Sequence, residues 1–142
     1  MRHPILLALA LTVLTANKCR NEGPTMADLL NTRWEFRTVD GQAVAMPADV
    51  DRPWLRLTDD GVQGFGGCNR MMGGYELNDA RLTFPGLATT RMYCEAVQKT
   101  ENAITKALSE VDNYTFVDGL LSLRKGEQVL ATLTAGADAD QP

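Results

Sequence analysis

Two cysteines, Cys68 and Cys94, constrain this chain more than any other feature of its 142 residues. They enclose 25 residues. The chain opens with a stretch typical of an export signal, so both thiols are expected to meet an oxidising compartment. These conditions favour a structural disulfide over two free thiols. Closing a loop of this length stabilises a domain by roughly 3–4 kcal/mol in the chain-entropy description. A redox site is not indicated, because the chain has no Cys-x-x-Cys motif.

Residues 1–18 are predicted to be a signal peptide. A short positive head precedes the almost wholly apolar stretch Pro4–Ala16, which is shorter than the ~20 residues of a membrane-spanning helix. Two cleavage sites remain open. Cleavage after Ala16 gives a soluble product, whereas cleavage before Cys19 gives a lipoprotein acylated on that thiol. Lipidation leaves an even number of cysteines, but Lys18 stands where a lipobox has Gly or Ala.

Acidity and the lack of histidine exclude several function classes. The net charge of −4 becomes −6 without residues 1–18, because 12 basic residues then face 18 acidic ones. An acidic domain without a Lys/Arg cluster binds nucleic acid poorly. The lone histidine, His3, leaves with the signal, which removes the commonest general base and transition-metal ligand. Two thiolates alone do not complete a usual zinc site. We therefore expect no metal, no cofactor and no nucleic-acid partner.

Residues 26–134 are predicted to form one domain, between a polar tether at 19–25 and a disordered tail at 135–142. The segment Glu95–Val111 lacks Gly and Pro and carries an apolar stripe, so it is predicted to be a helix packed on a sheet. Short strand patterns separated by turn residues dominate the remainder. They cover residues 33–39, 54–58, 62–65, 75–77, 81–84, 114–117, 120–124 and 129–133.

The glycine run Gly64–Gly67 lacks the Gly-Lys-Ser/Thr sequence of a phosphate loop. Its glycines favour a backbone kink out of a strand, and Asn69 can tolerate left-handed geometry and bond its own backbone, as turn asparagines do. The neighbouring carboxylates of Asp59 and Asp60 precede a turn glycine and are expected to be solvated. Catalysis by a carboxylate pair remains an alternative with little support in the sequence.

Arginine and methionine side chains surround both cysteines in the sequence, and a Cys68–Cys94 bond would bring them together. Flexible methionines beside arginine can make an adaptable binding surface. The alternative is that the methionines fill gaps in the core and the arginines are solvated. The candidate surface residues are Arg70, Met71, Met72 and Arg91.

Motifs spread along the domain resemble those of the META domain family. The run from Gly67 to Tyr75 resembles its Gly-Cys-Asn-x-x-x-Gly-x-Tyr element, and the run from Thr90 to Cys94 resembles its Thr-x-Met-x-Cys element. A tryptophan in the opening strand and a glutamate in the helix complete the match. The residues that carry the resemblance are Trp34, Gly67, Cys68, Asn69, Gly73, Tyr75, Thr90, Met92, Cys94 and Glu101.

The resemblance implies a single compact α+β domain with a mostly antiparallel, strongly curved sheet and one long packed helix. It also implies an exported protein of the periplasm or outer membrane, linked to stress tolerance and without enzymatic activity. We expect such a protein to bind an envelope protein or a lipid, and to contact the membrane only through an anchor at Cys19.

Two other functions remain open at this stage. A secretion-pilot-like chaperone would bind a lipid or peptide in a deep apolar cavity between helix and sheet. A small hydrolase would instead need a buried carboxylate pair in a cleft.

Overall fold

The computed structural model describes residues 29–137, so the predicted signal peptide and the whole predicted tether, including Cys19, lie outside the described residues. Within this range no helix is long and apolar enough to cross a membrane. The elements in chain order are β1 (Trp34–Val39), β2 (Gln42–Ala43), β3 (Trp54–Thr58), β4 (Gly61–Phe65), β5 (Arg70–Gly73), β6 (Glu76–Asn78), β7 (Arg81–Thr83), β8 (Ala88–Thr89), α2 (Gln98–Glu110), β9 (Asn113–Val117), β10 (Leu120–Lys125) and β11 (Gln128–Ala135).

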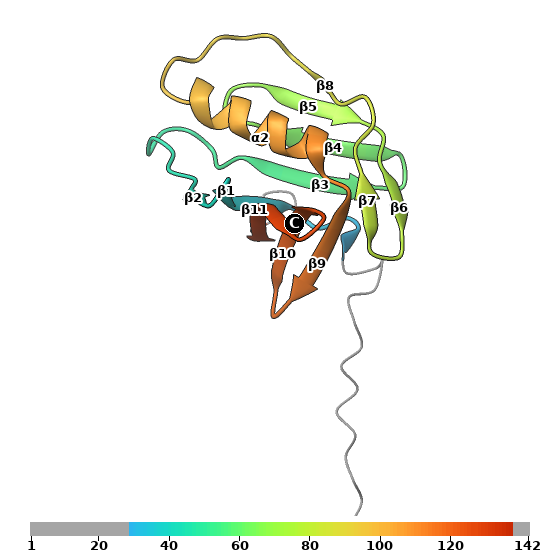
Figure 1. The fold of residues 1–142 in the computed structure, drawn as a ribbon. Helices are drawn as coiled ribbons and strands as arrows, with labels where there is room; N and C mark the ends of the chain where they lie inside the picture. Colours follow the sequence, from blue (N-terminus) through green and yellow to red (C-terminus); the bar gives the residue numbers. More distant parts are fainter. Residues whose placement is uncertain (1–28, 138–142) are drawn as a thin grey trace, which may run out of the picture.

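The strands form one sheet that curls into a half-barrel (Figure 1). Its order is β6-β7-β9-β10-β11-β1-β3-β4-β5-β8, with β2 added beside β1, and neighbouring strands are antiparallel. The strand β1 lies inside the sheet, where Trp34 is opposite Ala135 of β11 on one side and Leu55 of β3 on the other. The predicted α+β domain with an antiparallel sheet and one helix is therefore confirmed.

Two Asp-Gly turns have the backbone geometry that joins adjacent antiparallel strands. Asp118 and Gly119, between β9 and β10, have φ angles of 52° and 79°, and Asp40 and Gly41, between β1 and β2, have 50° and 74°. Positive φ at both central residues is the signature of a two-residue hairpin turn whose twist matches that of the strands. The short Asp-Gly pairs thus fix these hairpins locally.

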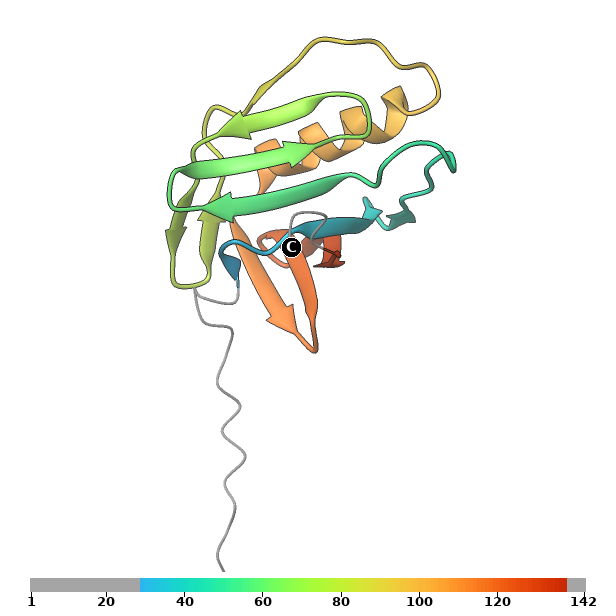
Figure 2. The same cartoon turned by 180° about the vertical axis from the view of Figure 1, so that it is seen from behind.

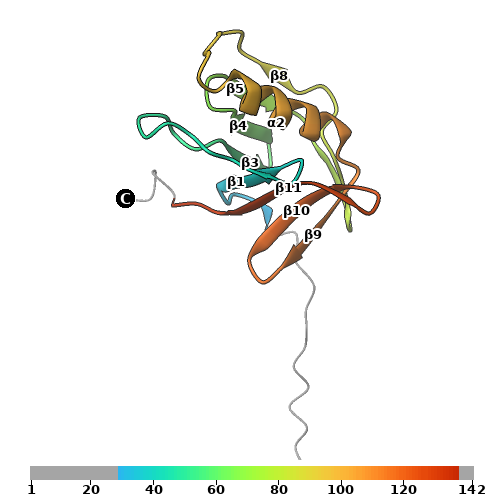
Figure 3. The ribbon, with the colours of Figure 1, turned by 60° about the vertical axis from the view of Figure 1, so that its left-hand side comes forward.

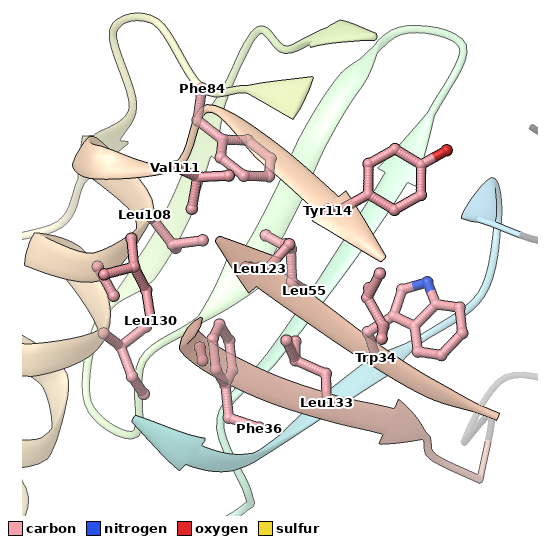
Figure 4. Packing of buried hydrophobic residues seen from close by; sticks show 14 of the residues in the cluster. Trp34, Phe36, Leu55, Phe84, Leu108, Val111, Tyr114, Leu123, Leu130 and Leu133 are labelled. Atoms are coloured by element: carbon pink, nitrogen blue, oxygen red, sulfur yellow. The ribbon is translucent and has the colours of Figure 1, made fainter. Parts of the chain in front are cut away.

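The helix α2 lies across the concave face of the sheet, and from behind the molecule β3, β4 and β5 pass in front of it (Figures 1 and 2). Its buried stripe includes Ile104 and Leu108, which belong to the same core as Phe36, Leu123 and Leu130 (Figure 4). The helix starts at Gln98, three residues later than predicted. Before it, the chain makes a turn in which the N–H groups of residues 97 and 98 donate to the Cys94 carbonyl.

The sequence does not predict β2, β5 or β8. The strand β5 is rich in methionine and glycine, and β2 and β8 are two residues long, so none shows a clear alternating pattern. The predicted domain boundary also differs slightly. The strand β11 continues to Ala135, and the Gly136 N–H donates to the Arg33 carbonyl at 2.8 Å.

Two tyrosines predict a loss of stability in alkali. Burial raises the pKa of Tyr75 and of Tyr114, and the carboxylates of Asp59 and Asp79 respectively raise them further. A raised pKa means that the folded state holds the phenolic proton more tightly than the unfolded state does. The stabilisation is therefore complete below the ordinary tyrosine pKa of about 10 and is lost as the pH rises through the folded value.

We expect the free energy of unfolding to fall as the pH rises above about 10, measured by urea unfolding. The double variant Tyr75→Phe/Tyr114→Phe should lose less over the same range, because it no longer carries these two protons. An equal loss in the double variant and the wild type would contradict this assignment.

Candidate functional site

The predicted bond between Cys68 and Cys94 is present, with a Cα–Cα distance of 5.9 Å. Cys68 lies in the turn between β4 and β5, and Cys94 lies in the segment that leads to α2. The disulfide therefore joins the two motifs of the sequence that are most distinctive, and it brings them against the start of the helix.

Beside the disulfide, Asn69 and Glu101 form a buried polar pair, each only 4% exposed. The Asn69 backbone N–H donates to Glu101 Oε1 at 2.6 Å, and its side-chain Nδ2 donates to Oε2 at 2.7 Å. One asparagine thus occupies both oxygens of one carboxylate. Hydrogen bonds to a charged acceptor are stronger than neutral ones, and a buried carboxylate without such partners would be costly.

The same asparagine also holds the segment before the helix. Its Oδ1 accepts hydrogen bonds from Thr90 Oγ1 at 2.8 Å and from the Met92 N–H at 2.7 Å. Its Nδ2 donates in addition to the Met92 carbonyl at 2.9 Å. Asn69 does not adopt the left-handed geometry that an asparagine tolerates, since its φ is not positive. Its side chain instead forms hydrogen bonds that connect the start of β5 with the segment 90–92 and with α2.

This arrangement is a structural brace and does not have the form of an acid–base pair. Glu101 faces an amide rather than a second carboxylate, and both of its oxygens already accept hydrogen bonds. Among residues 29–137, no group of three His, Cys, Asp or Glu side chains is placed to hold a metal ion.

The braced segment is itself exposed to solvent and runs beside an open groove. Met92 is 59% exposed and Tyr93 is 77% exposed. Figure 3 shows the connection from β8 to α2 passing over the top of the molecule. Between this connection and the helix lies a groove of about 590 Å³, with residues 89–92 on one wall and polar side chains of α2 on the other.

The four candidate surface residues do not form one surface. Met71 is only 2% exposed and belongs to the core, so its assignment to a binding surface is wrong. Arg70 and Met72 flank it in β5 and are exposed, because neighbouring residues of a strand point to opposite faces. Arg91 instead lines the groove beside α2.

Two of the remaining motif residues, Trp34 and Tyr75, lie away from this brace. Trp34 is buried in the core, where its ring meets Phe116 edge-on at 5.4 Å and its Nε1 donates to the Leu29 carbonyl. Tyr75 lies beyond the far end of β5 and donates its hydroxyl to the Thr58 carbonyl at 3.0 Å. These contacts stabilise the fold at a distance from the groove.

The polar wall of α2 was not singled out as a site by sequence reasoning. The helical spacing places Asn102, Lys106 and Ser109 only on the face opposite the apolar stripe. The sequence does carry one signal for the brace, since Glu101 interrupts the apolar stripe that includes Val97, Ile104 and Leu108. A carboxylate in the middle of a core-facing stripe requires a buried partner.

Replacing Gly66 with alanine should weaken the brace. An added Cβ would stand 2.6 Å from Glu101 Oε1, so the carboxylate would have to move away from Asn69. We expect a loss of about 2 kcal/mol or more in the free energy of unfolding, measured with urea. The matched control is Gly74→Ala, whose Cβ meets nothing within 4 Å and should change stability by less than about 0.5 kcal/mol. Equal effects of the two substitutions would contradict the prediction.

A curled antiparallel sheet, one helix across its concave face and a disulfide-braced segment beside that helix define a small single-domain α+β protein. The profile of the META domain matches residues 27–137, and the chain belongs to the META domain family.

Individual relatives agree with this assignment. The chain is 29% identical over 126 residues to a curated protein of Escherichia coli (strain K12), "Heat shock protein HslJ", a match that covers 86% of this chain and 89% of that protein. A protein from Burkholderia xenovorans, solved by NMR, is similar in structure with a TM-score of 0.63 and 26% identity, covering 97% of this chain and 99% of that one. A second NMR structure has the same TM-score and identity and covers 79% of this chain and 95% of its own.

Proposed function

We propose that this protein is an exported envelope protein that supports stress tolerance by binding a protein or lipid partner, without catalysing a reaction. Membership of the META domain family and similarity to a protein named for heat shock support the role in stress. The apolar N-terminal stretch supports the proposed compartment, as does the disulfide, because such a bond persists in oxidising surroundings.

One observation carries the binding role. Cys68 and Asn69, the latter itself bonded to Glu101 of α2, hold a short exposed segment in a fixed shape, and that segment presents Arg91, Met92 and Tyr93 beside a groove. A loop held rigidly by its scaffold loses little conformational freedom on binding, and exposed aromatic and methionine side chains are enriched in interfaces.

The two alternative functions find less support. Core side chains such as Ile104 and Leu108 fill the region between α2 and the sheet within the described residues, which does not favour a pilot-like apolar cavity. The buried carboxylate of Glu101 is paired with an amide, which does not favour a hydrolase that uses two carboxylates.

The test of the binding role is survival of heat by a strain that lacks the gene and carries a plasmid copy. The double variant Met92→Ser/Tyr93→Ser should fail to restore survival while its melting temperature stays that of the wild type, because both side chains are exposed. The control is Val117→Ser/Val129→Ser, which removes exposed apolar side chains elsewhere. Full restoration by the first variant would overturn the proposed role of this segment.

The envelope location is tested by fractionation and by labelling with palmitate. If Cys19 is the acylated residue, the label follows the protein into the membrane fraction and is lost in Cys19→Ser. If the signal is cut after Ala16, the product is a soluble periplasmic protein that begins at Asn17. Recovery of the uncleaved chain in the cytoplasm of the native host would overturn the proposal of export.

A further inference from the structure

The sheet ends at β8, and backbone groups on its outer edge have no strand beside them in the described part of the chain. The Thr90 N–H donates to the Arg70 carbonyl at 3.1 Å, so the backbone of Thr90 faces β5. Because these groups alternate along an antiparallel strand, the N–H and C=O of Thr89 and Arg91 face the opposite way. An unpaired strand edge therefore lies along the wall of the groove.

The opposite wall of the groove is a stripe of uncharged polar side chains. Spacings of four, three and four residues place Gln98, Asn102, Thr105 and Ser109 on one side of α2. Gln98 Oε1 is buried without a hydrogen-bond partner in the described structure. A buried acceptor of this kind is costly unless a donor reaches it. The stripe is about 16 Å long at 1.5 Å per residue, which corresponds to about five residues of extended chain.

The charges around the groove favour an acidic ligand. Arg91 stands on the strand wall and Lys106 on the helix wall, while the carboxylate that lines the groove, Glu101, is already bonded to Asn69. This basic site occurs in a chain with a net charge of −4. A carboxylate entering between the two cations would be attracted by both of them.

We propose that the groove binds an extended segment of another protein, about five residues long and containing an acidic residue, which adds to β8 as a further strand. Main-chain hydrogen bonds to Thr89 and Arg91 supply the attachment, and alternate side chains of the bound segment face the polar stripe of α2. The inference rests on the proposed binding function and specifies the partner and its mode of attachment.

The probe is the peptide acetyl-Thr-Val-Asp-Val-Thr-amide, titrated to millimolar concentration into the ¹⁵N-labelled mature protein. The amide signals of Thr89, Arg91, Gln98 and Asn102 should shift in proportion to binding, and the Thr89 amide should exchange more slowly with solvent. Two N-methylated analogues distinguish strand addition from side-chain contact. In the first analogue the methyl groups block the N–H groups along one edge of the peptide, and in the second they block those along the other edge. A strand uses one edge of the peptide, so one analogue should lose binding and the other should keep it.

Two variants locate the site. Lys106→Glu should weaken the affinity at least about tenfold, whereas the control Lys99→Glu, exposed on the same helix but outside the groove, should leave it unchanged. Thr89→Pro removes the outward N–H without removing a hydrogen bond to β5, so it should abolish binding. If this variant fails to fold, Lys106→Glu still decides the question, because its side chain is exposed.

Several results would overturn the inference. They are an absence of shifts at the groove and equal binding of both methylated analogues. The truncated chain without residues 138–142 is compared with the full chain, both without peptide. If the same amide signals shift, the acidic tail of the chain itself occupies the groove, and the inference is overturned. A Lys106→Glu protein that loses the peptide but restores heat survival would overturn this inference and leave the proposed stress function intact.

Discussion

The variant Asn69→Asp is expected to lose about 4 kcal/mol or more in its free energy of unfolding. It replaces the Nδ2 donor, which lies 2.7 Å from Glu101 Oε2, by an oxygen, and so places two carboxylates face to face in a buried site. It also removes the hydrogen bond from Nδ2 to the Met92 carbonyl. Breaking a buried interaction of a charged group in this way costs several kcal/mol, because the charge is left without compensation.

Urea unfolding at pH 7 measures this loss, with Asn78→Asp as the control. Asn78 is an exposed asparagine in β6, so the same change of charge there should alter stability by less than about 0.5 kcal/mol.

The double variant Asn69→Asp/Glu101→Gln tests the cause of the loss. It again places a donor opposite an acceptor, and it should be more stable than Asn69→Asp alone by at least about 1 kcal/mol. A double variant less stable than the single one would show that the shape of the site, and not the pairing of charge and donor, determines the effect.

Loss of the disulfide is the second large effect. The bonded cysteines are 26 residues apart in the sequence, and opening a loop of this length costs about 3.5 kcal/mol in the chain-entropy description. Local effects should add to this, because the bond holds the β4–β5 turn against the segment that begins α2. We expect Cys68→Ser/Cys94→Ser to unfold at a markedly lower urea concentration than the wild type.

Reductant provides the matched comparison. Dithiothreitol should lower the stability of the wild type to nearly that of the double variant, and it should not affect the double variant itself. If the wild type keeps its full stability after complete reduction, verified by mass, then the hydrogen bonds around Asn69 hold the site without help from the bond.

Local patterns were sufficient to predict most strands and the helix. Asp118 and Gly119 select a two-residue turn, and the alternating pattern of β10 and β11 predicts paired strands on either side of short turns. The strand order could not be predicted in this way. The pairing of β1 with both β11 and β3 depends on contacts between distant segments, which no short pattern encodes.

The site was predictable as a set of residues but not as an arrangement. Asn69 and Glu101 are 32 residues apart, and only the folded sheet shows that one asparagine bonds the helix and the segment around Met92 at the same time. The two methionines of β5 illustrate the same limit. Met71 is buried and Met72 is exposed. Because the sequence does not predict β5 as a strand, it does not show which of the two methionines faces the core.

The position of β1 has a consequence for how the protein is made. This strand is the first among the described residues, yet one of its two long neighbours, β11, is the last among them. During synthesis β1 and β10 each keep an open edge until residues 128–135 have appeared, so the half-barrel cannot be completed from the N-terminus onward. The sheet is therefore complete only after the final strand has emerged, and we expect the domain to finish folding after its synthesis rather than during it.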